Sequence, residues 1–161
     1  NVVLDLMIHD IDIILSLVQS KIQQIHAVGV PVVTPEVDIA NARLIFENGC
    51  VANVTASRIS MKSMRKIRFF QKDTYISVDY ADHDITVVRK DDKGTSLPVP
   101  GMSMDRLTFD KADSLKAEIE SFIASVQTRR RPLASGLDGR KALKVAIDIV
   151  KQITASSETV F

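Results

Sequence analysis

The stretch NVVLDLMIHDIDIILSLV, residues 1–18, decides how the rest of this chain can fold. Most of its residues are aliphatic, and its polar residues are not scattered. Four of them follow the spacing i, i+4, i+7 and i+11, which places side chains on one face of a helix: Asp5, His9, Asp12 and Ser16. A helix that is apolar on its other faces is normally buried. The stretch therefore predicts a buried helix with one polar face.

Asp5 and His9, one helical turn apart, allow two interpretations. Lone buried polar groups are costly, so the carboxylate and the imidazole either satisfy each other or take part in chemistry. On spacing alone, a structural pair is the commoner outcome. Asp12 lies on the same face, where a structural role such as bonding loop backbone is expected, and Asp10 lies off it.

Composition narrows the classes of function. The chain has 161 residues, 45% of them hydrophobic and 25% charged, with a formal net charge of +1. Such a chain suits one globular domain and has no overall basic field for nucleic acid. A single cysteine, Cys50, excludes an internal disulfide and a thiolate metal cluster, and fits a cytoplasmic protein. The charged residues in 1–18 argue against a membrane span.

The basic and histidine residues give weaker signals. Lys62, Arg65, Lys66 and Arg68 could suit a phosphate-bearing substrate or RNA, but a solvated strand face is the commoner explanation. His26 and His83 have no second ligand at a metal-like spacing, so no metal site is expected. Cys50 is expected to serve packing.

The middle of the chain reads as consecutive strands. Residues 21–30, 37–46 and 50–57 show strand-like patterns, and Asn48-Gly49 between the last two is a strong hairpin turn signal. Shorter strands are expected over 67–71, 75–80 and 85–90. Residues 61–64 and 96–104 are expected to be loops.

Two helices are expected to finish the chain. Residues 112–128 carry one apolar stripe that consists of Leu115, Ile119, Phe122, Ile123 and Val126. Ser135 and Asp138 resemble a capping box that opens a helix over 139–156. Its inward residues are expected to be Leu143, Ala146, Ile147, Val150 and Ile153.

The order of helix, strands and helices predicts an α+β fold, with an open, mostly antiparallel or mixed sheet and helices packed on one face. We expect residues 1–161 to form a single substrate-binding and oligomerisation domain. Because the chain opens on Asn1 and runs almost directly into a helix, we expect it to be the C-terminal part of a larger protein. The open sheet face is a candidate surface for a homo-oligomer such as a dimer.

Two stretches resemble a known family. Residues 4–12, LDLMIHDID, look like the helix that opens the C-terminal domain of the Gfo/Idh/MocA oxidoreductases. Residues 118–143, which include Arg130-Arg131-Pro132 and GRKAL, are similar to the closing helices of that domain. The resemblance implies a dihydrodipicolinate reductase-like α+β domain that follows an N-terminal Rossmann domain binding NAD or NADP. No G-x-G-x-x-G pattern occurs here, so no cofactor-binding residue is expected in this chain.

The resemblance also implies roles for individual residues. His9 would act as the acid/base on a substrate hydroxyl, and Asp5 would orient the substrate or the imidazole. Both would bind substrate, and Asp12 is a further candidate for substrate binding. Histidine is the side chain that titrates near neutrality, as oxidation of an alcohol requires. The expected substrate is a sugar, cyclitol or related polyol.

Three functions remain open from the sequence. The first is an NAD(P)-dependent oxidoreductase acting on a CH–OH group, with this fragment alone inactive. The second is a stand-alone binding or dimerisation module without catalysis, in which His9 is structural. The third is a related enzyme with another net reaction, such as redox-assisted glycoside cleavage.

Overall fold

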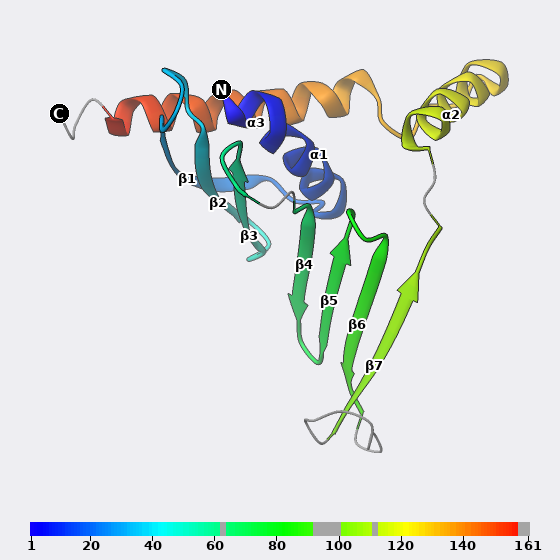
Figure 1. Ribbon diagram of the computed structural model, residues 1–161. Helices are drawn as coiled ribbons and strands as arrows, with labels where there is room; N and C mark the ends of the chain where they lie inside the picture. Colours follow the sequence, from blue (N-terminus) through cyan, green and yellow to red (C-terminus); the bar gives the residue numbers. More distant parts are fainter. Residues whose placement is uncertain (62–63, 92–100, 111–112, 158–161) are drawn as a thin grey trace. The chain divides into compact units, whose positions relative to one another are not determined.

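The computed structural model describes residues 1–61, 64–91, 101–110 and 113–157. The chain divides into two compact units, Asn1–Ser60 with Ser121–Phe161 and Met61–Glu120. Each unit contains one antiparallel sheet, and helices lie at both ends of the chain (Figure 1). The α+β class and the antiparallel strand arrangement predicted from the sequence are therefore confirmed.

The chain opens with a helix in two parts. Val3–Met7 forms a π-helical turn, and α1 continues over Ile8–Leu17. Oδ1 of Asn1 accepts a hydrogen bond of 3.0 Å from the Val3 N–H, which satisfies one of the free donors at the helix start. Only one stripe of this helix is buried, whereas Leu4, Leu6 and Leu17 are exposed. The expectation that all apolar faces of this helix are buried is therefore wrong for the chain as described.

The first unit contains sheet A, with strand order β1-β2-β3. Its strands are β1 (Ile22–Val30), β2 (Ile39–Phe46) and β3 (Val51–Ser57). The hairpin predicted at Asn48-Gly49 joins β2 to β3, and Gly49 has a φ of 83°, which glycine adopts without a steric penalty. The residues of β2 alternate between buried and open positions, so one face of the sheet is covered.

The second unit contains sheet B, with strand order β4-β5-β6-β7. Its strands are β4 (Lys66–Gln71), β5 (Thr74–Asp79), β6 (Asp84–Lys90) and β7 (Met102–Thr108). β7 was not predicted, because the loop expected over 96–104 covers its first residues. The antiparallel pairing of β7 with β6 makes it a strand despite its weak local pattern. Residues 96–100 of that expected loop and 62–63 of the earlier one lie outside the described residues.

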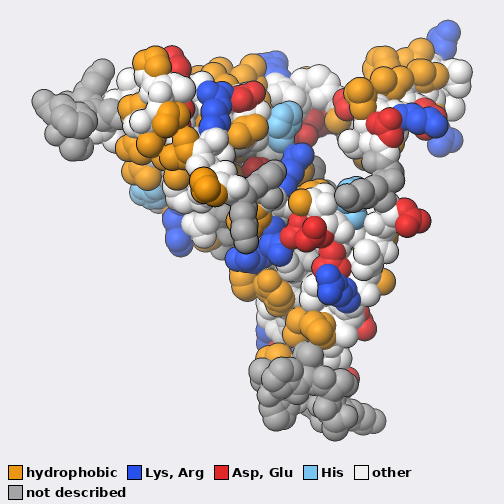
Figure 2. All heavy atoms as spheres, in the orientation of Figure 1, with side chains coloured by type: hydrophobic (Ala, Val, Ile, Leu, Met, Phe, Trp, Pro, Cys, Tyr) orange, Lys and Arg blue, Asp and Glu red, His pale blue; other side chains and the backbone are white. Residues whose placement is uncertain are grey.

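Helix α2 (Ser114–Thr128) presents its predicted apolar stripe to solvent. No residue of this helix is buried, and the five side chains of the stripe are 47–64% exposed. Figure 2 shows hydrophobic side chains gathered along one side of α2. The chain as described therefore supplies no cover for this face.

Helix α3 (Gly136–Ser157) covers sheet A. Ala142, Ala146, Ile149 and Ile153 are its buried residues, and Val150 packs at the edge of the core. The expectation that Leu143 and Ile147 point inward is wrong, because both are exposed. The buried stripe runs along the small residues Ala142 and Ala146, which allow the helix to approach α1 and β1 closely.

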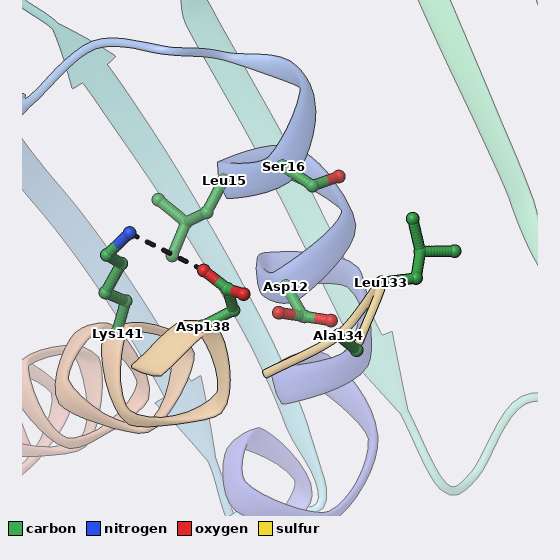
Figure 3. A pocket seen from close by; sticks show the side chains of 7 residues that line it. All are labelled: Asp12, Leu15, Ser16, Leu133, Ala134, Asp138 and Lys141. Atoms are coloured by element: carbon green, nitrogen blue, oxygen red, sulfur yellow. Dashed lines mark ion pairs between the residues drawn. The ribbon is translucent and has the colours of Figure 1, made fainter. Parts of the chain in front are cut away.

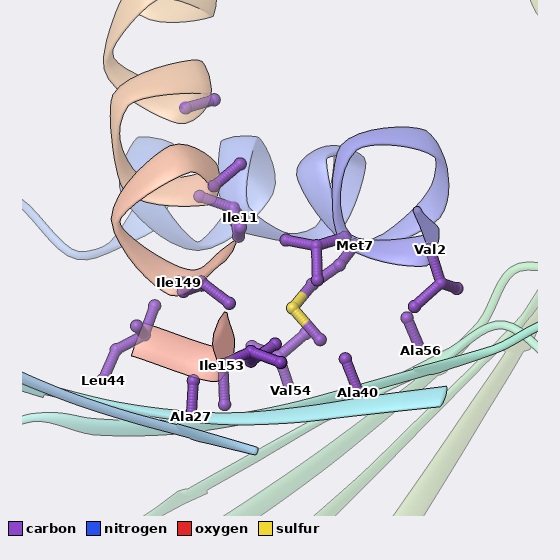
Figure 4. Packing of buried hydrophobic residues seen from close by; sticks show 14 of the residues in the cluster. Val2, Met7, Ile11, Ala27, Ala40, Leu44, Val54, Ala56, Ile149 and Ile153 are labelled. Atoms are coloured by element: carbon purple, nitrogen blue, oxygen red, sulfur yellow. The ribbon is translucent and has the colours of Figure 1, made fainter. Parts of the chain in front are cut away.

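The core lies between the opening helix, α3 and sheet A (Figure 4). Met7 and Ile11 meet Ile149 and Ile153 above the alanines of the strands. Gly29 of β1 is part of this fit, since a Cβ there would lie 3.0 Å from Ile153 Cδ1 and 2.8 Å from Val37 Cγ1. Close packing of this kind fixes the opening helix, and with it the polar residues on its outer side. No helix among the described residues is long and apolar enough to cross a membrane.

Candidate functional site

The polar face of the opening helix is the candidate site. Val3, Met7 and Ile11 are buried against sheet A and α3, and this orientation turns Asp5 and His9 to the exposed side. Asp5 lies within the π-helical turn, which ends where α1 begins. Single π turns inside helices occur frequently at functional sites, because they alter the direction of side chains locally.

Asp5 pairs with Arg58 rather than with His9. Nη2 of Arg58 donates a hydrogen bond of 2.8 Å to Asp5 Oδ2. The Asp5 side chain is 61% exposed and that of Arg58 is 33% exposed. Both residues are exposed to solvent, so Asp5 and His9 do not form the buried pair that the non-catalytic interpretation requires.

Arg58 is a residue of this site that the sequence did not predict. It follows the last residue of β3, and its backbone N–H donates to the Asp38 carbonyl at 3.0 Å. It lies 53 residues from Asp5 along the chain. No local pattern connects the two residues, so only the packing of the opening helix on β3 brings them together.

Asp38 was also missed, and it supports Arg58. Oδ2 of this buried aspartate accepts hydrogen bonds from the backbone N–H groups of Val32, Val33 and Thr34 at 2.8–2.9 Å. These bonds, above all that from Thr34, hold the pKa of the Asp38 carboxyl well below its usual range. The carboxylate therefore fixes the loop between β1 and β2, and its carbonyl fixes the backbone of Arg58.

Asp12 lines a small cavity between α1 and the start of α3 (Figure 3). The cavity has a volume of about 80 Å³, and its walls include Ser16, Leu133 and Ala134. On the α3 side of the cavity, Lys141 Nζ lies 3.6 Å from Asp138 Oδ1. The structure therefore brings Asp12 and Ser16 of the polar face together with the N-terminal turn of α3.

The predicted capping box is confirmed and is larger than expected. Oδ2 of Asp138 accepts hydrogen bonds from the Ser135 hydroxyl at 2.6 Å and from the Ser135 N–H at 3.1 Å. Arg131 Nη2 adds a contact of 2.8 Å to the same oxygen. The Ser135 hydroxyl and then Arg131 hold the pKa of Asp138 well below its usual range. This network fixes the wall of the cavity that faces Asp12.

The other candidate residues have local structural contacts. Lys66 pairs with Asp79 at 3.0 Å, and Arg65 lies 5.5 Å from the centre of the Tyr80 ring. Lys62 lies outside the described residues. Cys50 packs at the edge of the core, as expected. His26 is exposed on β1, and His83 occupies a turn with a φ of 54°.

The possible metal ligands among the described residues are dispersed. Among these residues, no three of His, Cys, Asp and Glu gather in a way that could hold a metal ion. The sequence contains no glycine-rich dinucleotide-binding turn.

Comparison with known proteins agrees with this architecture. Residues 1–76 match the family described as "GFO/IDH/MocA C-terminal domain". UDP-N-acetylglucosamine 3-dehydrogenase of Acidithiobacillus ferrooxidans is 36% identical over 149 residues, which are 92% of this chain and 47% of that protein. A solved structure of the same enzyme superimposes with a TM-score of 0.90 at 35% identity, and covers 96% of this chain and 49% of that one.

A more distant structure shares the fold alone. Levoglucosan dehydrogenase in complex with NADH and levoglucosan has a TM-score of 0.84 at 14% identity, and the match covers 97% of this chain and 49% of that one. The chain spans about half the length of these relatives.

The fold and the polar helix together match the GFO/IDH/MocA C-terminal domain over residues 1–76, and the similarity to the Acidithiobacillus ferrooxidans dehydrogenase extends over 92% of the chain.

Proposed function

We propose that this chain is the substrate-binding and oligomerisation domain, over residues 1–161, of an NAD(P)-dependent oxidoreductase that oxidises a CH–OH group of a sugar, cyclitol or related polyol. The observation that carries the proposal is the exposed polar face of the opening helix, where Asp5 and His9 lie opposite the buried stripe that holds the helix in place. The relative at 36% identity is named as a dehydrogenase of a nucleotide sugar, which supports this reaction class.

In this proposal His9 accepts the proton of the substrate hydroxyl as the alcohol is oxidised. Its exposed imidazole is accessible to a ligand, and histidine is the usual side chain for proton transfer near neutral pH. Asp5 orients the substrate through a carboxylate that Arg58 already holds. Asp12, at the small cavity, is a further residue for substrate binding. NAD or NADP, when bound outside this chain's residues, supplies the hydride acceptor.

The test uses the protein with its natural sequence upstream of Asn1. Reduction of NAD and of NADP is followed with neutral sugars, cyclitols and nucleotide sugars, and His9→Asn is compared with His83→Asn. His9 is exposed, and His83 occupies a turn with a φ of 54° that asparagine also adopts, so the two substitutions perturb packing little. We expect His9→Asn to reduce turnover on the order of 10²- to 10⁴-fold and His83→Asn to leave it unchanged.

The rival function is a binding or dimerisation module without catalysis. It requires that His9→Asn change stability rather than turnover. Equal activities of the two histidine variants, with a lowered melting temperature for His9→Asn alone, would therefore support the module and overturn the enzyme.

Oligomerisation is a separate part of the proposal. The open face of sheet A carries Val28, Val30 and Val51 at 41–63% exposure, which is apolar area for a second copy to cover. Light scattering across a range of protein concentrations measures the mass. We expect a homo-oligomer that Val28→Asp converts to a smaller species, whereas a monomer at all concentrations would contradict it.

A further inference from the structure

Arg58 lies within hydrogen-bonding distance of a proposed catalytic carboxylate, and it has no other assigned role. It contacts Asp5 Oδ2 through Nη2 at 2.8 Å. In the part of the chain that the structure describes, Asp5 Oδ1 accepts no hydrogen bond. One carboxylate oxygen is therefore anchored, and the other is open.

The backbones of both partners in this pair are held in place by other contacts. The backbone of Arg58 is bonded to Asp38, whose buried carboxylate accepts three backbone N–H groups of the neighbouring loop. Asp5 is flanked in its π turn by Val3 and Met7, which are fully buried. The contact thus connects two fixed backbones, and the direction of the Asp5 carboxylate is determined by the pair.

Stability is a weak reason for such a pair. Exposed ion pairs contribute little to folding, because water and salt screen them and two long side chains must be ordered. The Asp5 side chain is 61% exposed, and that of Arg58 is 33% exposed. The geometry is nevertheless well formed, with a distance typical of a charge-assisted hydrogen bond.

We infer that Arg58 is a positioning residue, which holds Asp5 Oδ2 so that Oδ1 points at a substrate hydroxyl beside His9. The inference rests on the proposed function, because it assigns a purpose to the Asp5 carboxylate within that reaction. A misplaced orienting group lowers the rate of the chemical step even when the substrate still binds. Arg58 thus acts on the reaction through Asp5 and does not act on the substrate itself.

The test is a double-mutant cycle in the full-length enzyme with Asp5→Asn, Arg58→Gln and the double variant. Arg58→Lys, which keeps the charge, tests rescue, and Arg89→Gln is the matched control. Arg89 in β6 also forms an exposed ion pair with an aspartate, at 3.5 Å from Asp105 Oδ2, and lies outside the proposed site and the open face of sheet A. The values of kcat, KM and the melting temperature are measured for each variant, together with His9→Asn.

We expect Arg58→Gln to lower kcat on the order of 10- to 100-fold, with a smaller change in KM. In the Asp5→Asn background the same substitution should change kcat less than about twofold, because the carboxylate to be positioned is gone. Arg58→Lys should recover part of the lost kcat. The melting temperature should move by less than about 4 °C in every Arg58 variant.

Two results would overturn the inference: an unchanged kcat in Arg58→Gln, or an equal loss of kcat in the presence and absence of the Asp5 carboxylate. A loss of activity that follows a large fall in melting temperature would overturn it as well. The His9→Asn variant separates the two proposals. If His9→Asn is inactive while Arg58→Gln is normal, the positioning role fails and the proposed function stands, whereas a fully active His9→Asn contradicts the function itself.

Discussion

The two sheets of this chain are stabilised in different ways. Sheet A has one face covered by α1 and α3. Fifteen hydrophobic side chains of the sheet and its helices are buried in a single cluster that includes Phe46, Leu44, Ile11 and Ile149. In sheet B no described residue is buried, and every residue of its strands is partly or fully exposed to solvent. The comparison teaches that the polar face of the opening helix is placed by a buried core, whereas sheet B has a regular antiparallel ladder but no buried residue among those described. The candidate site stands on the unit that has the core.

The largest expected difference between the sheets is the effect of removing an aromatic ring. Phe46 in β2 is 1% exposed, and Phe70 in β4 is 77% exposed. Because burial sets the cost of a large-to-small change, Phe46→Ala should lower the free energy of unfolding by about 3–5 kcal/mol, and Phe70→Ala by less than about 1 kcal/mol. Denaturant unfolding measures both. A similar cost for the two would show that sheet B is covered in solution.

The second prediction concerns acid. The pKa of Asp38 in the first unit is lowered, mainly by backbone N–H groups, and that of Asp79 in the second unit is lowered, mainly by Lys66. A lowered carboxyl pKa stabilises the fold above the unfolded value of about 3.9, and that stability is lost as the pH falls through the folded value. Unfolding should therefore become easier below about pH 4. In Asp38→Asn the dependence on pH there should be shallower, and the variant should be less stable at pH 7.

Asp79→Asn serves as the counterpart of Asp38→Asn in sheet B. Its melting temperature is followed over the same range of pH, with amide hydrogen exchange of β5 as the local probe. We expect the exchange of β5 to rise while the amides of β2 stay protected. An identical pH dependence in wild type and Asp38→Asn would contradict the role of the Asp38 carboxylate.

A smaller effect is expected from the close contact between β1 and α3. An alanine Cβ at Gly29 would lie 3.0 Å from Ile153 Cδ1 of α3 and 2.8 Å from Val37 Cγ1, so Gly29→Ala should cost about 1–3 kcal/mol. Gly139 is an exposed residue of α3, and a Cβ there would meet no atom within 4 Å. Gly139→Ala should therefore raise the free energy of unfolding by up to about 1 kcal/mol. Thermal unfolding measures whether each substitution lowers or raises the stability. A Gly29→Ala variant as stable as the wild type would mean that α3 does not pack tightly on β1.

The smallest expected effect distinguishes the turns of the two sheets. Sheet A turns at Gly49, with a φ of 83°, whereas sheet B turns at Asp73 and His83, with φ values of 59° and 54°. Glycine relieves the steric cost of positive φ but adds entropy to the unfolded chain. His83→Gly should therefore gain no more than about 1 kcal/mol, and Gly49→Ala should lose about 1 kcal/mol. A clear loss of stability in His83→Gly would show that its side chain has a contact of its own.

The parts of the fold that local pattern specifies were predicted well. The hairpin at Asn48-Gly49, the alternation in β2 and the Ser135–Asp138 cap all depend on residues within a few positions of one another. β7 was missed because its strand character comes from pairing with β6 and not from its own alternation. Leu143 and Ile147 were placed inward because a helical stripe of large residues normally faces the core. Here the small residues Ala142 and Ala146 face it instead.

The sequence by itself determined the α+β class, the order of the elements apart from β7, the resemblance to the family and the polar face that holds Asp5, His9 and Asp12. Spacing along a helix or strand is a local property, and these features depend on it. Only the tertiary structure decided that Asp5 pairs with Arg58, that Asp38 supports that arginine and that Asp12 meets the cap of α3. These contacts join segments far apart in the chain. The packing of buried apolar side chains sets them, and no local pattern encodes which distant backbone that packing will bring near.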